Sequence, residues 1–118
     1  MVRIALTTRV TDAEGYSEPR DSISHDWIQL LDSWAMTPMV LPNRLSDPCR
    51  YLDAVEADLL IFTGGEDPGT SPMRDKTENA LLAYALECDL PVLGVCRGLQ
   101  LMNICFNGVL TTIDGHVA

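Results

Sequence analysis

The fold of this chain is decided by the stretch Leu90-Pro-Val-Leu-Gly-Val-Cys-Arg-Gly-Leu-Gln-Leu-Met-Asn103. It opens with residues 91–95, an apolar run rich in β-branched residues and too short for a helix, which predicts a buried strand of a parallel sheet. Residues 99–106 follow as a predicted helix. The stretch therefore predicts a strand that turns directly into a helix.

Cys96 lies in the turn, with Gly94 two residues before it and Gly98 two residues after it. Because glycine lets neighbouring backbone approach closely, this spacing predicts a strained, tight turn that presents the cysteine as a nucleophile. The N-terminus of the following helix and the adjacent Arg97 both favour a thiolate. The alternative is that Cys96 is only a small apolar residue at the end of a buried strand. The two glycines favour the nucleophile.

The rest of the chain alternates predicted strands and helices. Further strands are predicted over residues 2–8, 37–41 and 57–62, with a shorter fifth strand over 109–113. Helices are predicted after the N-cap Ser24, with an apolar face of Trp27, Leu30, Leu31 and Trp34, after Asp47-Pro48, and from a capping box Asp75-x-x-Glu78. Residues 11–20 are predicted to form a loop. This order predicts an α/β fold, a flavodoxin-like doubly wound sheet whose first four strands are parallel.

A glycine-rich loop, residues 63–69, follows the predicted strand 57–62 and is the second candidate functional segment. Gly64 and Gly65 lie at the carboxyl end of that strand, where ligands of open α/β sheets bind and where exposed N–H groups can hold an anion. The alternative is an ordinary turn. With Cys96 following the next strand, we expect an oxyanion-binding loop.

Composition excludes several classes of function. Eight basic and seventeen acidic residues give a net charge of −9, which argues against nucleic-acid binding. No apolar run is long enough to span a bilayer, and the N-terminus lacks the features of a signal peptide, so we expect a cytoplasmic protein. The four cysteines show no CxxC pair and no zinc-ligand spacing, so neither a disulfide framework nor a metal site is expected.

Three motifs in order resemble one known family. Residues 94–100, Gly-Val-Cys-Arg-Gly-Leu-Gln, resemble the nucleophile motif of class I glutamine amidotransferases. The form Cys-Arg-Gly-Leu-Gln is most similar to the γ-glutamyl hydrolase branch (peptidase C26-like), which includes γ-glutamyl-γ-aminobutyrate hydrolases. Residues 62–68 and 74–78 match two further motifs of that branch. The resemblance covers essentially all of residues 1–118, but only the N-terminal half of such a domain, so we expect a single, incomplete domain.

The resemblance implies a hydrolase of γ-glutamyl amide bonds, with glutamine or another small γ-glutamyl compound as substrate and no metal or organic cofactor. Cys96 would attack the side-chain carbonyl, and the N–H groups of Gly65 and Arg97 would form the oxyanion hole. Gly64 and Gln100 would line the substrate pocket. In the family the general base is a His with a Glu two residues away, drawn from a segment downstream of this chain.

Neither histidine of the chain, His25 or His116, is expected to be that base. We therefore expect the chain alone to be inactive and to associate with a complementary C-terminal segment or with further copies of itself. A second hypothesis is a non-catalytic binding module. A third, a redox or stress-response relative, is disfavoured because such proteins place a Glu before the elbow loop, and residues 62–65 have none. In the loop, Arg9, Tyr16 and Arg20 are candidates for substrate contact.

Overall fold

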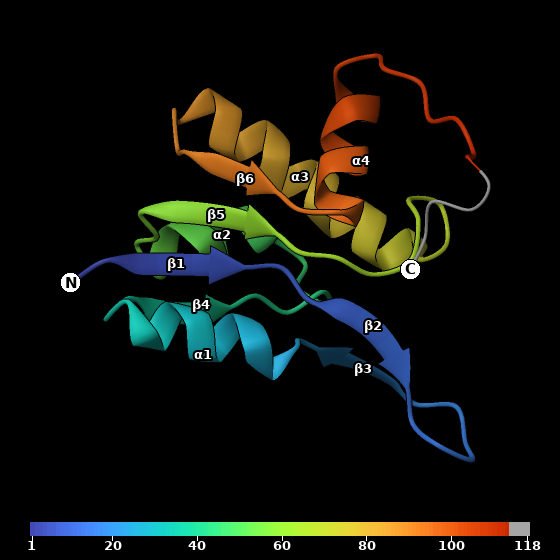
Figure 1. The fold of residues 1–118 in the computed structure, drawn as a ribbon, viewed down its shortest axis with the longest axis horizontal. Helices are drawn as coiled ribbons and strands as arrows, with labels where there is room; N and C mark the ends of the chain where they lie inside the picture. The colour runs from blue at the N-terminus through green and yellow to red at the C-terminus, as the bar shows by residue number, and fades with distance from the viewer. Residues whose placement is uncertain (114–118) are drawn as a thin grey trace.

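The computed structural model describes residues 1–113. Its centre is a parallel sheet of four strands in the order β4-β1-β5-β6 (Figure 1). The strands are β1 Arg3–Leu6, β4 Thr37–Val40, β5 Leu59–Phe62 and β6 Val92–Gly94. The chain adds β4 on one side of β1 and β5 on the other, so the direction of winding reverses between β1 and β5. Ligands of doubly wound sheets bind outside the carboxyl ends at such a reversal.

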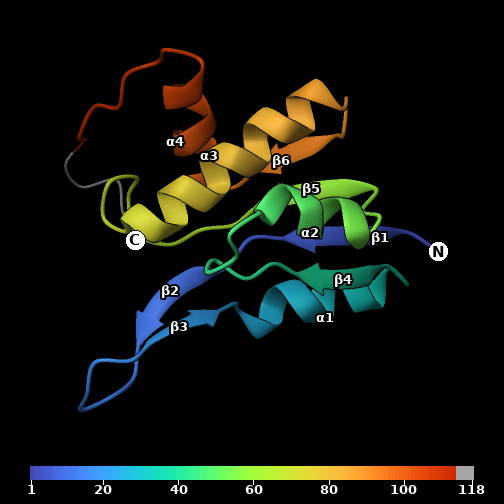
Figure 2. The ribbon, with the colours of Figure 1, turned by 180° about the vertical axis from the view of Figure 1, so that it is seen from behind.

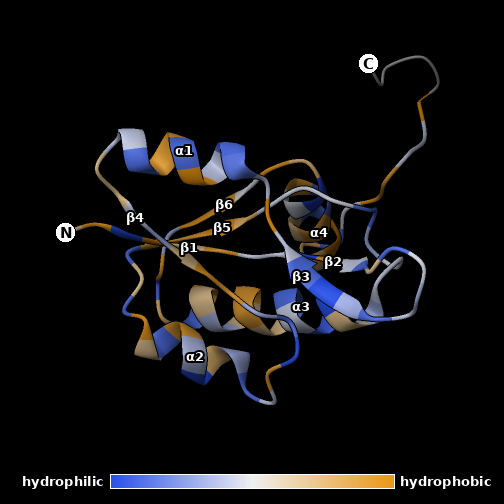
Figure 3. Ribbon diagram, turned by 90° about the horizontal axis from the view of Figure 1, so that it is seen from below, coloured by the Kyte–Doolittle hydropathy of each residue, from blue (hydrophilic) through white to orange (hydrophobic). Residues whose placement is uncertain are grey.

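Helices cover both faces of this sheet (Figure 3). They are α1 His25–Ser33, α2 Pro48–Ala54, α3 Pro72–Glu87 and α4 Arg97–Cys105. Successive strand residues face opposite sides, so Ile4 packs with Leu31 of α1. Ala5 and Leu60 pack on the other side with α2, α3 and α4, and α2 and α3 lie side by side there (Figure 2). The predicted α/β fold with a parallel sheet is confirmed.

The predicted helix after Ser24 is present as α1, but its apolar face differs from the prediction. Trp27 and Leu31 pack against the sheet as expected. Leu30 and Trp34 are 40% and 59% exposed, so their assignment to the core was wrong. The helix ends at Ser33, so Trp34 lies beyond the regular spacing that placed it on the buried face.

Helix α3 begins one turn earlier than predicted. Ser71 is its N-cap and accepts a hydrogen bond from the backbone N–H of Arg74, while Pro72 occupies the first turn, where its missing N–H costs nothing. The predicted capping box of Asp75 and Glu78 was therefore wrong. Both carboxylates lie inside the helix and pair with arginines instead.

Residues 11–20, predicted as a loop, belong mostly to an antiparallel hairpin that extends from the carboxyl end of β1 (Figure 1). Its strands are β2 Arg9–Asp12 and β3 Pro19–Ser22. Neither strand is buried, so no apolar alternation marks them in the sequence. Asn43 anchors the hairpin, because its side-chain amide donates to Asp21 Oδ1 at 2.8 Å and to the carbonyl of Thr8 at 3.0 Å.

Residues 109–113, predicted as a fifth strand, form no strand. Helix α4 ends at Cys105, and Asn107 adopts φ 66°, the left-handed conformation expected of a helix stop. Beyond it, Val109 is 83% exposed and Ile113 is 62% exposed. Apolar residues specify a strand only where a neighbouring strand and a covering layer bury them, and residues 1–113 provide neither for this segment.

The part of the chain that the structure describes contains no membrane-spanning helix and no metal-binding cluster. No helix within residues 1–113 is both long and apolar enough to cross a bilayer. The His, Cys, Asp and Glu residues of that range do not gather in groups of three or more that could hold a metal ion. All the cysteines are free thiols: Cys49, Cys88, Cys96 and Cys105.

Candidate active site

Cys96 occupies the turn between β6 and α4, as the N-cap residue of α4. Its backbone has φ 53° and ψ −110°, a conformation that costs a non-glycine residue on the order of 1–3 kcal/mol and that persists only where the surroundings impose it. The Cys96 side chain makes no capping hydrogen bond to the helix. No side chain caps the start of α4, although the backbone N–H of Gly98 donates to the Val95 carbonyl at 2.9 Å. Cys96 itself is exposed. The predicted strained turn is confirmed.

Two glycines make this turn possible. A Cβ on Gly98 would lie 2.7 Å from Phe62 Cβ and 2.8 Å from the Phe62 carbonyl carbon, and would meet the carbonyl oxygen closer still. A Cβ on Gly94 would lie 2.8 Å from the backbone of Gly98 and Leu99. These distances are shorter than van der Waals contact, so only glycine lets α4 start directly against β5. The sequence spacing predicted this close approach.

The loop after β5 passes beside Cys96. A Cβ on Gly64 would lie 3.6 Å from the Cβ of Cys96, at ordinary contact distance. The next residue, Gly65, has φ 148°, which side-chain-bearing residues rarely adopt, and a Cβ there would collide with the guanidinium of Arg74. The backbone N–H of Val95 donates to the Phe62 carbonyl at 3.0 Å, which ties the start of the loop to the turn.

Arg74 reaches from α3 beneath this loop and is almost completely buried. Its Nη1 donates to the carbonyl of Gly64 at 2.9 Å. Its Nη2 donates to the carbonyl of Thr63 at 2.9 Å and to the Thr63 hydroxyl at 3.2 Å. Its Nε donates to Glu78, one turn further along α3. Each of the three guanidinium nitrogens of Arg74 thus donates at least one hydrogen bond.

Arg97 follows Cys96, but its side chain points away from the thiol into the same buried region. Its Nη2 donates to Asp75 Oδ1 at 2.6 Å, and its Nη1 lies 3.5 Å from the carbonyl of Glu66. Its Nε lies 3.5 Å from Glu78 Oε2. Asp75 and Glu78 of α3 thus lie against the Arg97 guanidinium. The oxyanion-hole role expected of Arg97 concerns its backbone N–H, at the start of α4, and not this side chain.

Arg74, Asp75, Glu78 and Arg97 therefore form one ion cluster beneath the loop and the turn. Glu78 is fully buried, and burial raises the pKa of Glu78 while Arg74 and Arg97 oppose that rise. Burial likewise lowers the pKa of Arg74, and Glu78 opposes that change. Two positive and two negative groups face one another, so their formal charges balance, while Glu78 Oε1 and Arg97 Nε are buried without a hydrogen-bond partner among the described residues. Sequence analysis missed this cluster, although an Arg and a Glu four residues apart on a helix was the available signal.

Gln100 lies one turn into α4, and its backbone N–H donates to the carbonyl of Cys96 at 3.1 Å. Its side-chain Oε1 is buried and has no hydrogen-bond partner among residues 1–113. An unpartnered buried amide oxygen is costly unless another group satisfies it. This orphaned atom lies on the same helix as Cys96, which is compatible with the predicted contact between Gln100 and a substrate.

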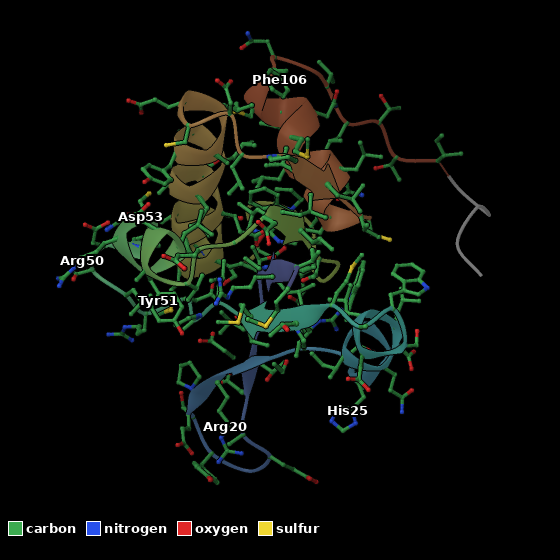
Figure 4. All side chains as sticks on the ribbon, turned by 90° about the vertical axis from the view of Figure 1, so that its left-hand side faces the viewer. Arg20, His25, Arg50, Tyr51, Asp53 and Phe106 are labelled. Carbon is green, nitrogen blue, oxygen red and sulfur yellow. The ribbon has the colours of Figure 1, made fainter. Side chains whose placement is uncertain are left out.

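The other predicted residues lie apart from Cys96. Arg20 lies in the outer part of the hairpin (Figure 4), and its Nη2 donates to Tyr16 Oη at 2.7 Å. Arg9 lies at its base, within 3.6 Å of the position of a Cβ on Gly65, so it is the hairpin cation nearest the loop. His25 is exposed on α1 and points into solvent (Figure 4). His116 lies outside the described residues.

The family comparison agrees with this geometry. Residues 2–114 match Peptidase C26. The chain belongs to the peptidase C26 family. A member of this class I glutamine amidotransferase-like family thus carries the buried ion cluster and the strained Cys96 turn described above.

Relatives of the chain are consistent with this assignment. It is 36% identical over 99 residues to a putative glutamine amidotransferase-like protein YvdE homolog of Lactococcus lactis subsp. cremoris, covering 71% of this chain and 52% of that protein. It is 29% identical over 123 residues to gamma-glutamyl-CDP-amidate hydrolase of Campylobacter jejuni, covering 97% and 60%. It is 30% identical over 87 residues to gamma-glutamyl-gamma-aminobutyrate hydrolase of Escherichia coli O157:H7, covering 62% and 34%. The chain spans about half the length of these curated relatives.

Proposed function

We propose that this chain carries the nucleophile and the oxyanion hole of a thiol hydrolase that cleaves γ-glutamyl amide bonds. The observation that carries the proposal is the backbone of Cys96, held at φ 53° at the start of α4, where no side chain caps the helix, with Gly64 alongside. Membership of the peptidase C26 family supports it, as do the names of two relatives that describe γ-glutamyl hydrolases. A strained backbone is retained where a function requires it.

In the proposed reaction the Cys96 thiolate attacks the side-chain carbonyl carbon of the γ-glutamyl group. The N–H groups of Gly65 and Arg97 bind the resulting oxyanion, and Gly64 and Gln100 line the pocket. The C–N bond then breaks, the amine leaves with a proton from the general base, and a thioester to Cys96 remains. Water hydrolyses the thioester, which releases glutamate and restores the thiol. The sequence consumes only the amide and water.

The general base and its orienting acid are proposed to come from a downstream segment. Within the described residues, the one histidine is His25, which is exposed on α1, and α1 lies on the face of the sheet opposite α3 (Figure 3). The curated relatives are about twice as long as the part that this chain matches. Strand β6 is an edge of the sheet, and Leu93 on it is 47% exposed, so further chain could pair and pack there.

The experiment is an assay of glutamine and γ-glutamyl amine hydrolysis by this chain alone and by the chain followed by its downstream segment. We expect turnover only from the longer protein, because loss of the base from a nucleophile–base pair removes most catalysis. Cys96→Ala in the longer protein should abolish turnover, and Cys105→Ala, on the same helix, is the matched control. Turnover that survives Cys96→Ala would refute the proposed nucleophile.

A non-catalytic module is the second candidate, because no general base accompanies Cys96 in the described part of the chain. Such a module would bind glutamine or a γ-glutamyl compound without consuming it. Calorimetry with glutamine, followed by analysis of the recovered ligand, separates the two. Intact glutamine after saturable binding by the longer protein would favour the module, and release of ammonia would favour the hydrolase.

A further inference from the structure

Arg74 is a charged side chain that is buried beneath the loop of Gly64 and Gly65. Only 1% of it is exposed, and its Nη1 and Nη2 are bound to the backbone of the loop that carries Gly64 and Gly65. Burying a guanidinium is expensive unless all its donors are engaged. The Arg74 side chain is not needed to cap the start of α3, since Ser71 already does so.

The bond from Arg74 to the Gly64 carbonyl fixes the direction of a neighbouring N–H group. The Gly64 carbonyl and the Gly65 N–H belong to one peptide unit, and this unit is trans. In a trans peptide the C=O and N–H vectors point in opposite directions. Because Arg74 holds the carbonyl toward α3 at 2.9 Å, the Gly65 N–H must point away from α3. A loop with a glycine at φ 148° has other conformations available, and this hydrogen bond selects one of them.

Glu78 in turn holds the guanidinium of Arg74. The carboxylate accepts from Arg74 Nε, which leaves Nη1 and Nη2 aimed at the two loop carbonyls. The same Glu78 oxygen lies 3.5 Å from Arg97 Nε, and Arg97 Nη2 donates to Asp75. The residue after Cys96 and the loop of Gly65 are therefore fastened to one carboxylate pair on α3.

We propose that Arg74 is a positioning residue that aims the Gly65 N–H into the oxyanion hole, with Glu78 holding the guanidinium in register. This inference rests on the proposed function, in which Gly65 binds the oxyanion. Arg74 acts through the peptide of Gly64 and does not contact the substrate. Its contribution is made in the transition state, where the oxyanion forms, so its loss should lower kcat and leave KM nearly unchanged.

The test uses the active protein, this chain with its downstream segment, and the variants Arg74→Lys and Arg74→Met. An ammonium can balance Glu78 but cannot span two carbonyls and a carboxylate, so Arg74→Lys should fold and still lose activity. We expect kcat to fall at least 10-fold for the lysine variant and about 100-fold for the methionine variant, with KM within about threefold. Arg3→Met is the matched control, because Arg3 makes an exposed pair with Glu56 at the other end of the sheet.

A second measurement distinguishes two roles of Arg74, orientation of the Gly65 N–H and general support of the fold. Iodoacetamide alkylates a thiol without using an oxyanion hole, whereas a glutamine-like chloroketone presents a carbonyl to it. In Arg74→Lys the chloroketone reaction at Cys96 should slow with kcat, while iodoacetamide alkylation stays at the wild-type rate. Equal slowing of both reactions, or wild-type kcat in the lysine variant, would overturn the inference while leaving the hydrolase intact. A wild-type protein without hydrolysis and without chloroketone labelling of Cys96 would instead overturn the proposed function, and this inference with it.

Discussion

Replacing Gly98 by alanine should destabilise the protein, although the residue lies in a helix where alanine is normally preferred. The intrinsic preference of helices for Ala over Gly is worth about 1 kcal/mol. Against it, the new Cβ would lie 2.7 Å from Phe62 Cβ and 2.8 Å from the Phe62 carbonyl carbon. Strand β5 cannot retreat, because it is paired on both sides, with β1 and β6. Overpacking typically costs about 1–3 kcal/mol, and an unyielding backbone favours the upper end.

Moving α4 away would also strain the hydrogen bond from Val95 to the Phe62 carbonyl, which is worth about 1 kcal/mol. Overpacking and the strained hydrogen bond, less the helix preference for alanine, together predict that Gly98→Ala lowers the free energy of unfolding by about 3 kcal/mol. With a urea slope of about 1.5 kcal/mol per molar, the midpoint should fall by about 2 M.

The assay is urea unfolding followed by circular dichroism, with Gly64→Ala as the matched control. A Cβ on Gly64 would meet Cys96 Cβ at 3.6 Å, an ordinary contact, so its midpoint should stay within about 0.4 M of the wild type. A Gly98→Ala protein as stable as the wild type, or more stable through its helix preference, would refute the close approach of α4 to β5.

Three further predictions concern the loop, an alkaline transition and the hairpin. Gly65→Pro removes the proposed oxyanion N–H and should lower kcat of the active protein about 100-fold, about 3 kcal/mol of transition-state binding; a wild-type rate would contradict that role. The neighbouring Cys88 and Asp53, whose Oδ1 accepts from Tyr84 Oη at 3.3 Å, raise the pKa of Tyr84 to about 12, above the unfolded value of about 10. The protonated phenol therefore stabilises the fold below about pH 10, and this contribution is lost as pH rises through about 12. Phenolate absorbance should show that transition, and Tyr84→Phe should lack it. Asn43→Ala removes the anchor of the hairpin and should destabilise the protein by about 2 kcal/mol, with faster tryptic cleavage in the hairpin; an unchanged digestion pattern would show that Asn43 does not hold it.

The strands of the sheet and the Cys96 turn could be predicted because local sequence encodes them. Residues 91–95 and 57–62 are short, mainly apolar runs that predict strands, and two glycines around Cys96 have few uses other than close backbone approach. The expected burial of 91–95 was wrong, because β6 is an edge strand and Leu93 on it is 47% exposed. The alternation of strands with helices then limits the fold to a parallel α/β sheet. The family resemblance adds roles for Gly65 and Arg97 that no local pattern supplies.

The parts that could not be predicted depend on tertiary contacts. Neither strand of the hairpin has a buried residue, so its strands carry no apolar alternation, and its anchor Asn43 lies far along the chain. Residues 109–113 have the composition of a strand but no neighbour to pair with among the described residues. Asp75 and Glu78 satisfy the spacing of a capping box, yet Asp75 pairs with Arg97, which becomes its neighbour only when α3 packs against the turn. Glu78 pairs with Arg74 four residues earlier on the same helix, a local spacing that does not reveal the burial of the pair.

The central claim is that Cys96 is the activated nucleophile of a γ-glutamyl pocket, and differential labelling tests it most directly. The protein is incubated with a glutamine-like chloroketone or diazo analogue, and adducts at each cysteine are quantified by mass spectrometry. Cys88 and Cys105 are exposed like Cys96, so they serve as internal controls for accessibility. The account predicts labelling of Cys96 well ahead of Cys49, Cys88 and Cys105, with protection by excess glutamine. Equal labelling of all four thiols, unaffected by glutamine, would contradict it.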